Sequence, residues 1–167
     1  MCLLIVKPKG VDIPSQEILD MAYRRNSDGN GFATKNYFFK TLNYDEFIKK
    51  LRNVGRDDAC IIHFRRATQG SICKQNCHPF KYKDVYFAHN GILNFTPKSD
   101  ITDSEYAFRR FLVPVIRRYG IDSVEVAQAV SQIIGWSKFA ILQGDKIIRF
   151  GQFVNIDGCY YSNTYYL

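Results

Sequence analysis

The chain has 167 residues, of which 46% are hydrophobic and 23% are charged. This length and balance predict one globular domain over residues 1–167 and exclude disordered and collagen-like proteins. The net charge of +7 favours acidic partners in general without specifying one. The apolar stretch that precedes Lys7 is only five residues long, which is too short for a membrane span, and it lacks the basic start of a secretory signal. We therefore expect a cytoplasmic protein.

Hydrophobic patterning in the N-terminal half predicts strands and helices along the chain. Ser15 is placed to cap a helix, because its hydroxyl can accept a hydrogen bond from a free N–H group of the first turn. A dense turn follows that helix in the segment Asn-Ser-Asp-Gly-Asn-Gly. The predicted elements are a strand over Leu3–Val6, a helix over Gln16–Arg25, the turn over 26–31, a strand over Phe32–Phe39, a helix over Asp45–Arg52, a strand over Cys60–Phe64 and an irregular loop over Arg66–Pro79.

The C-terminal half contains the same kinds of element. Thr102 begins a helix with a capping box, since Glu105 lies three residues later, and Pro114 breaks or restarts that helix. The other predicted elements are a strand over Asp84–His89 that ends at the turn Asn90-Gly91, a helix over Ser123–Ile134 with Val124, Ala127, Val130 and Ile134 facing inward, a hairpin over Lys138–Phe150 closed at Gly144-Asp145, and a strand over Tyr160–Asn163. This mixture predicts one layered α+β domain.

The five cysteines are an odd number, which argues against a disulfide framework. Cys73, Cys77 and His78 offer metal-binding atoms at close spacing, but a zinc site would need Cys60 and Cys159 to complete it. We therefore predict neither a metal site nor a cofactor, and zinc remains an alternative.

Cys2 is notable for its position. Removal of Met1 would place the thiol beside a free α-amine, whose ordinary pKa of about 7.7–8.0 lets it accept the thiol proton near neutral pH. The simpler interpretation is that residue 2 begins a buried strand, and position alone favours that interpretation.

Polar motifs follow Cys2 in the order Arg25 with Asn26-Ser-Asp28-Gly-Asn-Gly31, His63-x-Arg65-x-Ala-Thr68-x-Gly70, Asn76-x-His78-Pro-Phe80, His89-Asn90-Gly91 and Thr102-Asp103-Ser-Glu105.

Together with the Met-Cys start, this ordered series resembles the glutaminase domain of class II glutamine amidotransferases, which are N-terminal nucleophile enzymes. The resemblance runs from residue 2 to about 105, and Ser162-Asn163 resembles the family's late strand more weakly. It implies a four-layer αββα sandwich, in which two antiparallel sheets face each other and helices lie outside. It also implies hydrolysis of the side-chain amide of L-glutamine to glutamate and ammonia through a thioester on Cys2.

The resemblance assigns a role to each matching residue. Cys2 would be the nucleophile, with its own α-amine as the base. The side-chain amide of Asn90 and the backbone N–H of Gly91 would form the oxyanion hole. Arg65 would bind the α-carboxylate of glutamine with its guanidinium fork. Asp103 would bind the α-ammonium group of glutamine, and Thr68 would contribute a hydroxyl at the same end of the substrate. Arg25 and Asn26 would border the nucleophile.

Three residues depart from the family pattern. Arg66 stands where many members have tryptophan, Gln69 replaces a histidine that is common in synthase members, and Leu3 stands where glycine is frequent. The chain therefore looks closer to stand-alone members, which would release ammonia or supply it to a separate synthase. Arg65 and Asp103 hold only the glutamyl end, so another γ-glutamyl amide is an alternative substrate.

A catalytically silent binding module is a further alternative. It would use the basic surface on nucleic acid, with Tyr82 between Lys81 and Lys83 as its best support. Retention of every expected catalytic group argues against it, because a binding module has no chemical need for them. We expect neither nucleic acid nor a membrane as a partner.

Overall fold

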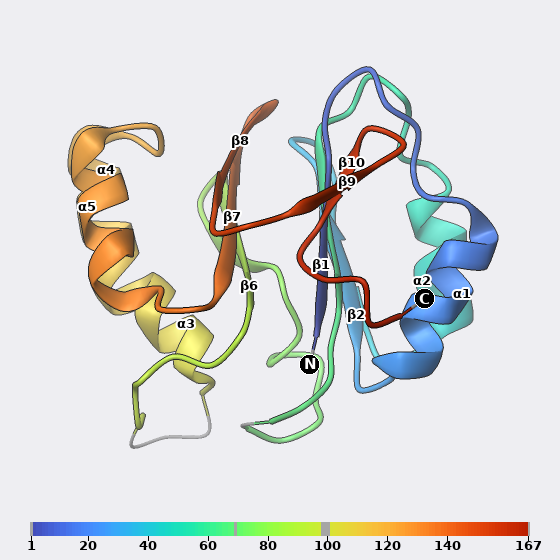
Figure 1. Cartoon of the computed structure of the whole chain (residues 1–167), viewed down its shortest axis with the longest axis horizontal. Coiled ribbons are helices and arrows are strands. Elements are labelled where there is room, and N and C mark those ends of the chain that lie inside the picture. The colour runs from blue at the N-terminus through green and yellow to red at the C-terminus, as the bar shows by residue number, and fades with distance from the viewer. Residues whose placement is uncertain (1, 69, 98–100, 167) are drawn as a thin grey trace.

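The structure is a computed structural model that describes residues 2–68, 70–97 and 101–166 (Figure 1). One sheet contains β1 (Leu3–Lys7), β2 (Asn30–Ala33), β3 (Phe38–Thr41), β4 (Cys60–Phe64), β9 (Val154–Ile156) and β10 (Cys159–Tyr161). The other contains β5 (Phe80–Tyr82), β6 (Val85–Asn90), β7 (Lys138–Gln143) and β8 (Lys146–Phe150). The helices are α1 (Gln16–Arg25), α2 (Tyr44–Leu51), α3 (Asp103–Ala107), α4 (Val113–Tyr119) and α5 (Val124–Ile133), with the π-helical segment η1 (Phe108–Leu112) between α3 and α4.

These elements form four layers, as the resemblance implied. The first sheet has the strand order β3-β2-β4-β1-β10-β9 and the second β5-β6-β7-β8, and the neighbouring strands are antiparallel. Helices α1 and α2 cover the outer face of the first sheet, and α3 to α5 cover the outer face of the second (Figure 1). The two sheets face each other between these helical layers.

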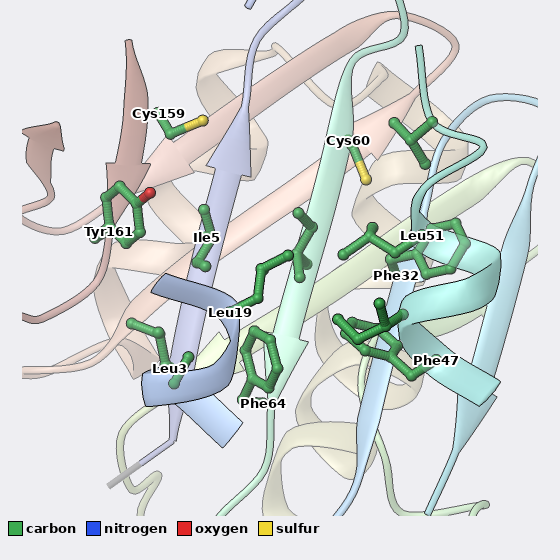
Figure 2. Close-up of a cluster of buried hydrophobic side chains, with 14 of the residues drawn as sticks. Leu3, Ile5, Leu19, Phe32, Phe47, Leu51, Cys60, Phe64, Cys159 and Tyr161 are labelled. Carbon is green, nitrogen blue, oxygen red and sulfur yellow. The ribbon is translucent and has the colours of Figure 1, made fainter. Parts of the chain in front are cut away.

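The alternation of side chains along β1 separates two of the hydrophobic cores. Leu3 and Ile5 belong to the core under α1 and α2 (Figure 2), whereas Leu4 and Val6 belong to the core between the sheets. Successive side chains of a strand point to opposite faces, so a strand buried on both faces is apolar at every position. This explains why Leu3–Val6 is continuously apolar instead of alternating with polar residues.

Several predicted elements are confirmed. Helix α1 has the predicted bounds, and the Ser15 hydroxyl accepts the N–H of Ile18. The β7–β8 hairpin closes at the predicted turn, with Gln143 paired to Lys146. Pro114 lies in the first turn of α4, where the helix restarts after η1, as expected.

Some predictions need correction. The segment Phe32–Phe39 is a hairpin of two strands, because the Thr34 hydroxyl accepts the N–H groups of Asn36 and Tyr37 and turns the chain. Strands β5 and β9 were not predicted. Thr102 caps α3 through the N–H of Glu105, but the carboxylate of Glu105 pairs with Arg109 instead of completing a capping box.

The predicted inward face of α5 is only partly right: Val130 is buried and Ile134 packs against the same core, but the other two predicted residues are exposed. Val124 is 68% exposed and Ala127 is exposed, whereas Val126 and Val130 are buried. Val126 and Val130 are four residues apart and therefore lie on one face of the helix, which is rotated from the predicted face.

None of the helices in the described part of the chain combines the length and the apolar character that a membrane crossing requires.

Candidate active site

The antiparallel pairing of β1 with β4 places Cys2 beside the start of the loop that carries Arg65. Leu3 pairs with Phe64, so the residues just outside this pair are neighbours at the end of the sheet. The sulfur of Cys2 lies 3.3 Å from both the backbone nitrogen and the carbonyl oxygen of Arg66. The register of two strands thus brings the predicted nucleophile to the predicted carboxylate-binding segment.

A small pocket opens at this point, and five of the eight predicted site residues line it. They are Cys2, Arg65, Thr68, Gly91 and Asp103. The pocket has a volume of only about 20 Å³, which is room for about one water molecule.

The Cys2 thiol is held in its neutral form by its surroundings. Burial raises the pKa of this thiol above its ordinary value, although the N–H of Arg66 and the charge of Arg65 act in the opposite direction. Because the thiolate is the nucleophilic form, this cysteine needs a base that removes its proton during attack. The thiol environment alone does not activate it.

Arg65 is 3% exposed, and part of its guanidinium is bound within its own loop. One terminal nitrogen donates to the carbonyl oxygen of Ser71 at 3.0 Å and the other to that of Gly70 at 3.4 Å. A guanidinium has five N–H donors. These contacts orient the guanidinium fork within the loop.

The turn over 26–31 holds the beginning of this loop. A carboxylate oxygen of Asp28 accepts the N–H of Ala67 at 2.8 Å, and the N–H of Asp28 donates to the carbonyl of Arg65 at 2.9 Å. The sequence placed Asp28 inside a motif but assigned it no role. The structure shows that it positions the segment next to the Cys2 sulfur.

Arg25 and Asn26 were predicted to border the nucleophile, and neither lines the pocket. Arg25 is exposed at the end of α1. Asn26 is buried and ends that helix, because its backbone N–H and its side-chain amide both donate to the carbonyl of Ala22. The structure therefore places Asn26 as a helix cap.

Gly91 follows β6 in a conformation that favours glycine. Its φ is +143°, and a Cβ at this position would collide with Ser137. Asn90 is buried and donates from Nδ2 to the Ser162 hydroxyl at 2.7 Å, while that hydroxyl accepts the N–H of Leu4 at 3.0 Å. An amide nitrogen carries two protons, so a second N–H donor remains on Asn90. Ser162 thereby ties Asn90 to β1.

Asp103 is buried at the start of α3 and is hydrogen-bonded through both oxygens. One accepts the N–H of Leu93 at 2.8 Å and the other the N–H of Ser104 at 2.7 Å. These bonds connect the segment after Gly91 to α3. They also satisfy a carboxylate that would otherwise be costly to bury.

Two of the three histidines, His78 and His89, line the pocket, and His63 packs against His78. Sequence reasoning considered His78 only for the zinc alternative and assigned the histidines no other role. The rings of His63 and His78 are 4.3 Å apart, and His89 contacts the Ser104 hydroxyl at 2.7 Å. Burial lowers the pKa of His63 and His89 to about 3, and that of His78 well below its ordinary value. They are therefore neutral near pH 7.

The zinc alternative concerned His78 together with Cys73 and Cys77. His78 instead packs against His63 and Phe80. In the described ranges, no three His, Cys, Asp or Glu side chains are grouped so that they could hold a metal ion.

Comparison with known proteins identifies the family and the fold. The family model "Glutamine amidotransferases class-II" matches residues 44–143. The probable glutamine amidotransferase DUG3 of Saccharomyces cerevisiae is 29% identical over 123 residues, which cover 53% of this chain and 34% of that protein. This chain thus spans about a third of the length of that relative.

A solved structure shares the fold. Glutamine phosphoribosylpyrophosphate amidotransferase from B. subtilis, complexed with ADP and GMP, superposes with a TM-score of 0.59 and 16% identity, over 96% of this chain and 41% of that one. The sandwich is therefore the N-terminal nucleophile hydrolase fold. The family model covers more than half of the chain, and the chain belongs to the class II glutamine amidotransferases.

Proposed function

We propose that this protein hydrolyses the side-chain amide of L-glutamine to glutamate and ammonia, with Cys2 as the nucleophile after removal of Met1. The observation that carries the proposal is the common pocket of Cys2, Arg65, Gly91 and Asp103. It joins a thiol, a cation, a backbone donor at a strand end and a buried carboxylate. Such a set matches the reacting carbonyl and both charges of a free amino acid.

The first half of the reaction forms a thioester. The α-amine of Cys2 takes the thiol proton as the sulfur attacks the side-chain carbonyl carbon of glutamine. Negative charge develops on the carbonyl oxygen, and the N–H of Gly91 and the free N–H of Asn90 would stabilise it. The C–N bond then breaks, and the α-ammonium returns the proton to the departing ammonia.

The second half consumes water. The α-amine removes a proton from water, which attacks the thioester carbon. The C–S bond breaks, glutamate leaves and the thiol is restored. The raised pKa of the Cys2 thiol supports this scheme, because a thiol that stays protonated near neutral pH needs a base within reach. With Met1 in place, the α-amine belongs to another residue and this base is missing.

The test combines intact mass with glutamate release from L-glutamine. The processed protein should lack the mass of Met1 and release glutamate. Cys2→Ala should lose at least about 10³-fold in kcat, as expected when a nucleophile is removed.

Cys73→Ala is the matched control. Cys73 is also a free, partly exposed cysteine, but it lies in the loop after Arg65 and outside the pocket lining. Its kcat should stay within about twofold of the wild type. Equal losses in both variants, or activity that survives in Cys2→Ala, would exclude Cys2 as the nucleophile.

A further inference from the structure

A second, larger pocket is lined by Asn90, one of the two predicted oxyanion residues. Its volume is about 470 Å³, within the range of small-molecule sites. It is bounded by Asn90 and Lys138 at the ends of β6 and β7, by Phe153 and Val154 near β9, and by Ser162 and Tyr165 after β10. The smaller pocket, described above, is lined by Cys2 and Gly91. Consecutive residues, Asn90 and Gly91, thus line different pockets.

The larger pocket also adjoins the backbone of the nucleophile. Asn163 lines it and donates from Nδ2 to the carbonyl oxygen of Cys2 at 2.9 Å. The two pockets therefore flank Cys2 and the Asn90-Gly91 turn. If the smaller pocket holds the glutamyl half of a substrate, the larger one is placed to take what lies beyond the C–N bond that breaks. Ammonia, the leaving group of glutamine, needs no such space.

The charge of the larger pocket indicates what it would bind. Lys138 is the one charged side chain among the described residues that line it. Lys138 is paired directly with Asn90 across the β6–β7 ladder, so both side chains are on the same face of the sheet. Lys138 is half-buried, and a partly desolvated ammonium favours a carboxylate partner.

Asn90, which lines the larger pocket, carries an acceptor without a partner. The Oδ1 atom of Asn90 is buried and has no hydrogen-bond partner among the described residues, whereas Nδ2 donates to Ser162. Leaving a buried acceptor unsatisfied costs about 1–3 kcal/mol. This oxygen lacks an N–H donor, and the amide that is cleaved brings one in glutamine and in substituted amides alike.

We infer that the larger pocket is a leaving-group subsite, and that the preferred substrates are γ-glutamyl amides whose amine half carries a carboxylate, such as γ-glutamyl dipeptides. This inference rests on the proposed function. The sulfur of Cys2 bonds to the γ-carbonyl carbon and the C–N bond breaks, and the amino acid leaves with the proton that the thiol lost. Water then cleaves the thioester, so that a γ-glutamyl amino acid and water give glutamate and the amino acid.

The experiment compares kcat/KM for L-glutamine, γ-L-glutamylglycine and γ-L-glutamylmethylamide, the last of which has no carboxylate on its amine half. In the wild type, γ-L-glutamylglycine should exceed both other substrates at least tenfold. In Lys138→Met, the ratio of γ-L-glutamylglycine to γ-L-glutamylmethylamide should fall at least tenfold. Lys138→Arg, which retains the charge, should keep most of that ratio.

Lys146→Met is the matched control, because Lys146 is an exposed lysine at the other end of the same hairpin. In this variant the ratio of kcat/KM for γ-L-glutamylglycine to that for γ-L-glutamylmethylamide should not change. The inference is overturned if Lys138→Met leaves the ratio of γ-L-glutamylglycine to γ-L-glutamylmethylamide unchanged. It is also overturned if the wild type has the same kcat/KM for glutamine as for γ-L-glutamylglycine. The proposed function stands in both of those cases. It fails together with the inference only if no substrate is cleaved, or if cleavage survives in Cys2→Ala.

Discussion

Arg65 and Asp103, the two charged residues proposed to hold the substrate, are already bound by groups of the protein. Asp103 accepts N–H groups from Leu93 and Ser104, and Arg65 donates to carbonyls of its own loop. These bonds lower the cost of burying charge and limit the orientations of each side chain. A site organised in this way loses less conformational entropy when it binds a ligand.

Gly91 allows the sharpest test at a single residue. In Gly91→Ala, a Cβ would meet Ser137 at a φ of +143°, so the backbone must shift and the proposed oxyanion donor moves with it. We expect kcat to fall about 10²–10³-fold, the usual loss for one such donor, and stability to fall by about 1–3 kcal/mol. Steady-state kinetics and urea unfolding measure the two effects.

Gly135→Ala is the control for backbone strain alone. Gly135 also has a positive φ, but a Cβ there would meet nothing within 4 Å. This variant should lose some stability and keep its kcat. A Gly91→Ala enzyme with wild-type kcat would show that this N–H does not stabilise the reacting oxygen.

At the scale of elements, the turn over 26–31 controls the loop that follows β4. Asp28→Ala removes the acceptor for the N–H of Ala67, and this bond holds the segment that contacts the Cys2 sulfur. We expect KM for glutamine to rise and kcat to fall, each about tenfold, because Arg65 and Arg66 would no longer be positioned. The loss of stability should be about 1 kcal/mol, typical of one hydrogen bond.

Asp28→Asn retains an acceptor oxygen and should recover most of the activity. Activity lost equally in the alanine and asparagine variants would mean that the charge of Asp28, and not its hydrogen bond, is required. Far-ultraviolet circular dichroism would establish that the sandwich is intact in both variants.

For the whole molecule, three buried neutral histidines connect stability to pH. Burial lowers the pKa of His63 and His89 to about 3 and lowers that of His78, whereas an unfolded histidine has a pKa near 6.5. Between these values the unfolded chain binds more protons than the folded one, so the free energy of unfolding decreases as the pH falls. The slope should approach about 1.4 kcal/mol per pH unit for each histidine.

Urea unfolding between pH 7 and pH 5 measures this slope in a range above the ordinary pKa of carboxylates. Imidazole proton resonances provide an independent check, because they should not titrate in the folded protein above pH 5. A stability that is flat with pH, or resonances that titrate near pH 6.5, would contradict the neutral, buried assignment.

Much of the molecule was predictable from local sequence. The Ser15 cap, the Gly144-Asp145 turn and the apolar run of β1 are set by residues close together in the chain, so pattern alone located them. The ordered motifs indicated the family, which the family model confirmed. The prediction of one strand over Phe32–Phe39 was wrong because a hydroxyl of Thr34 turns the chain. The inward face of α5 was only partly predicted, because it is set by packing against α4 and η1.

The sequence alone determined the type of each element with a strong local pattern, the family, and the polar residues that carry chemical interest. Tertiary structure alone decided which of these residues meet. The register of β1 on β4 brought Cys2 to Arg66, Asn26 became a helix cap, and Asn90 and Lys138 were placed side by side at a second pocket. Such contacts join residues that are distant in the chain, and only the pairing of strands and the packing of layers specifies them.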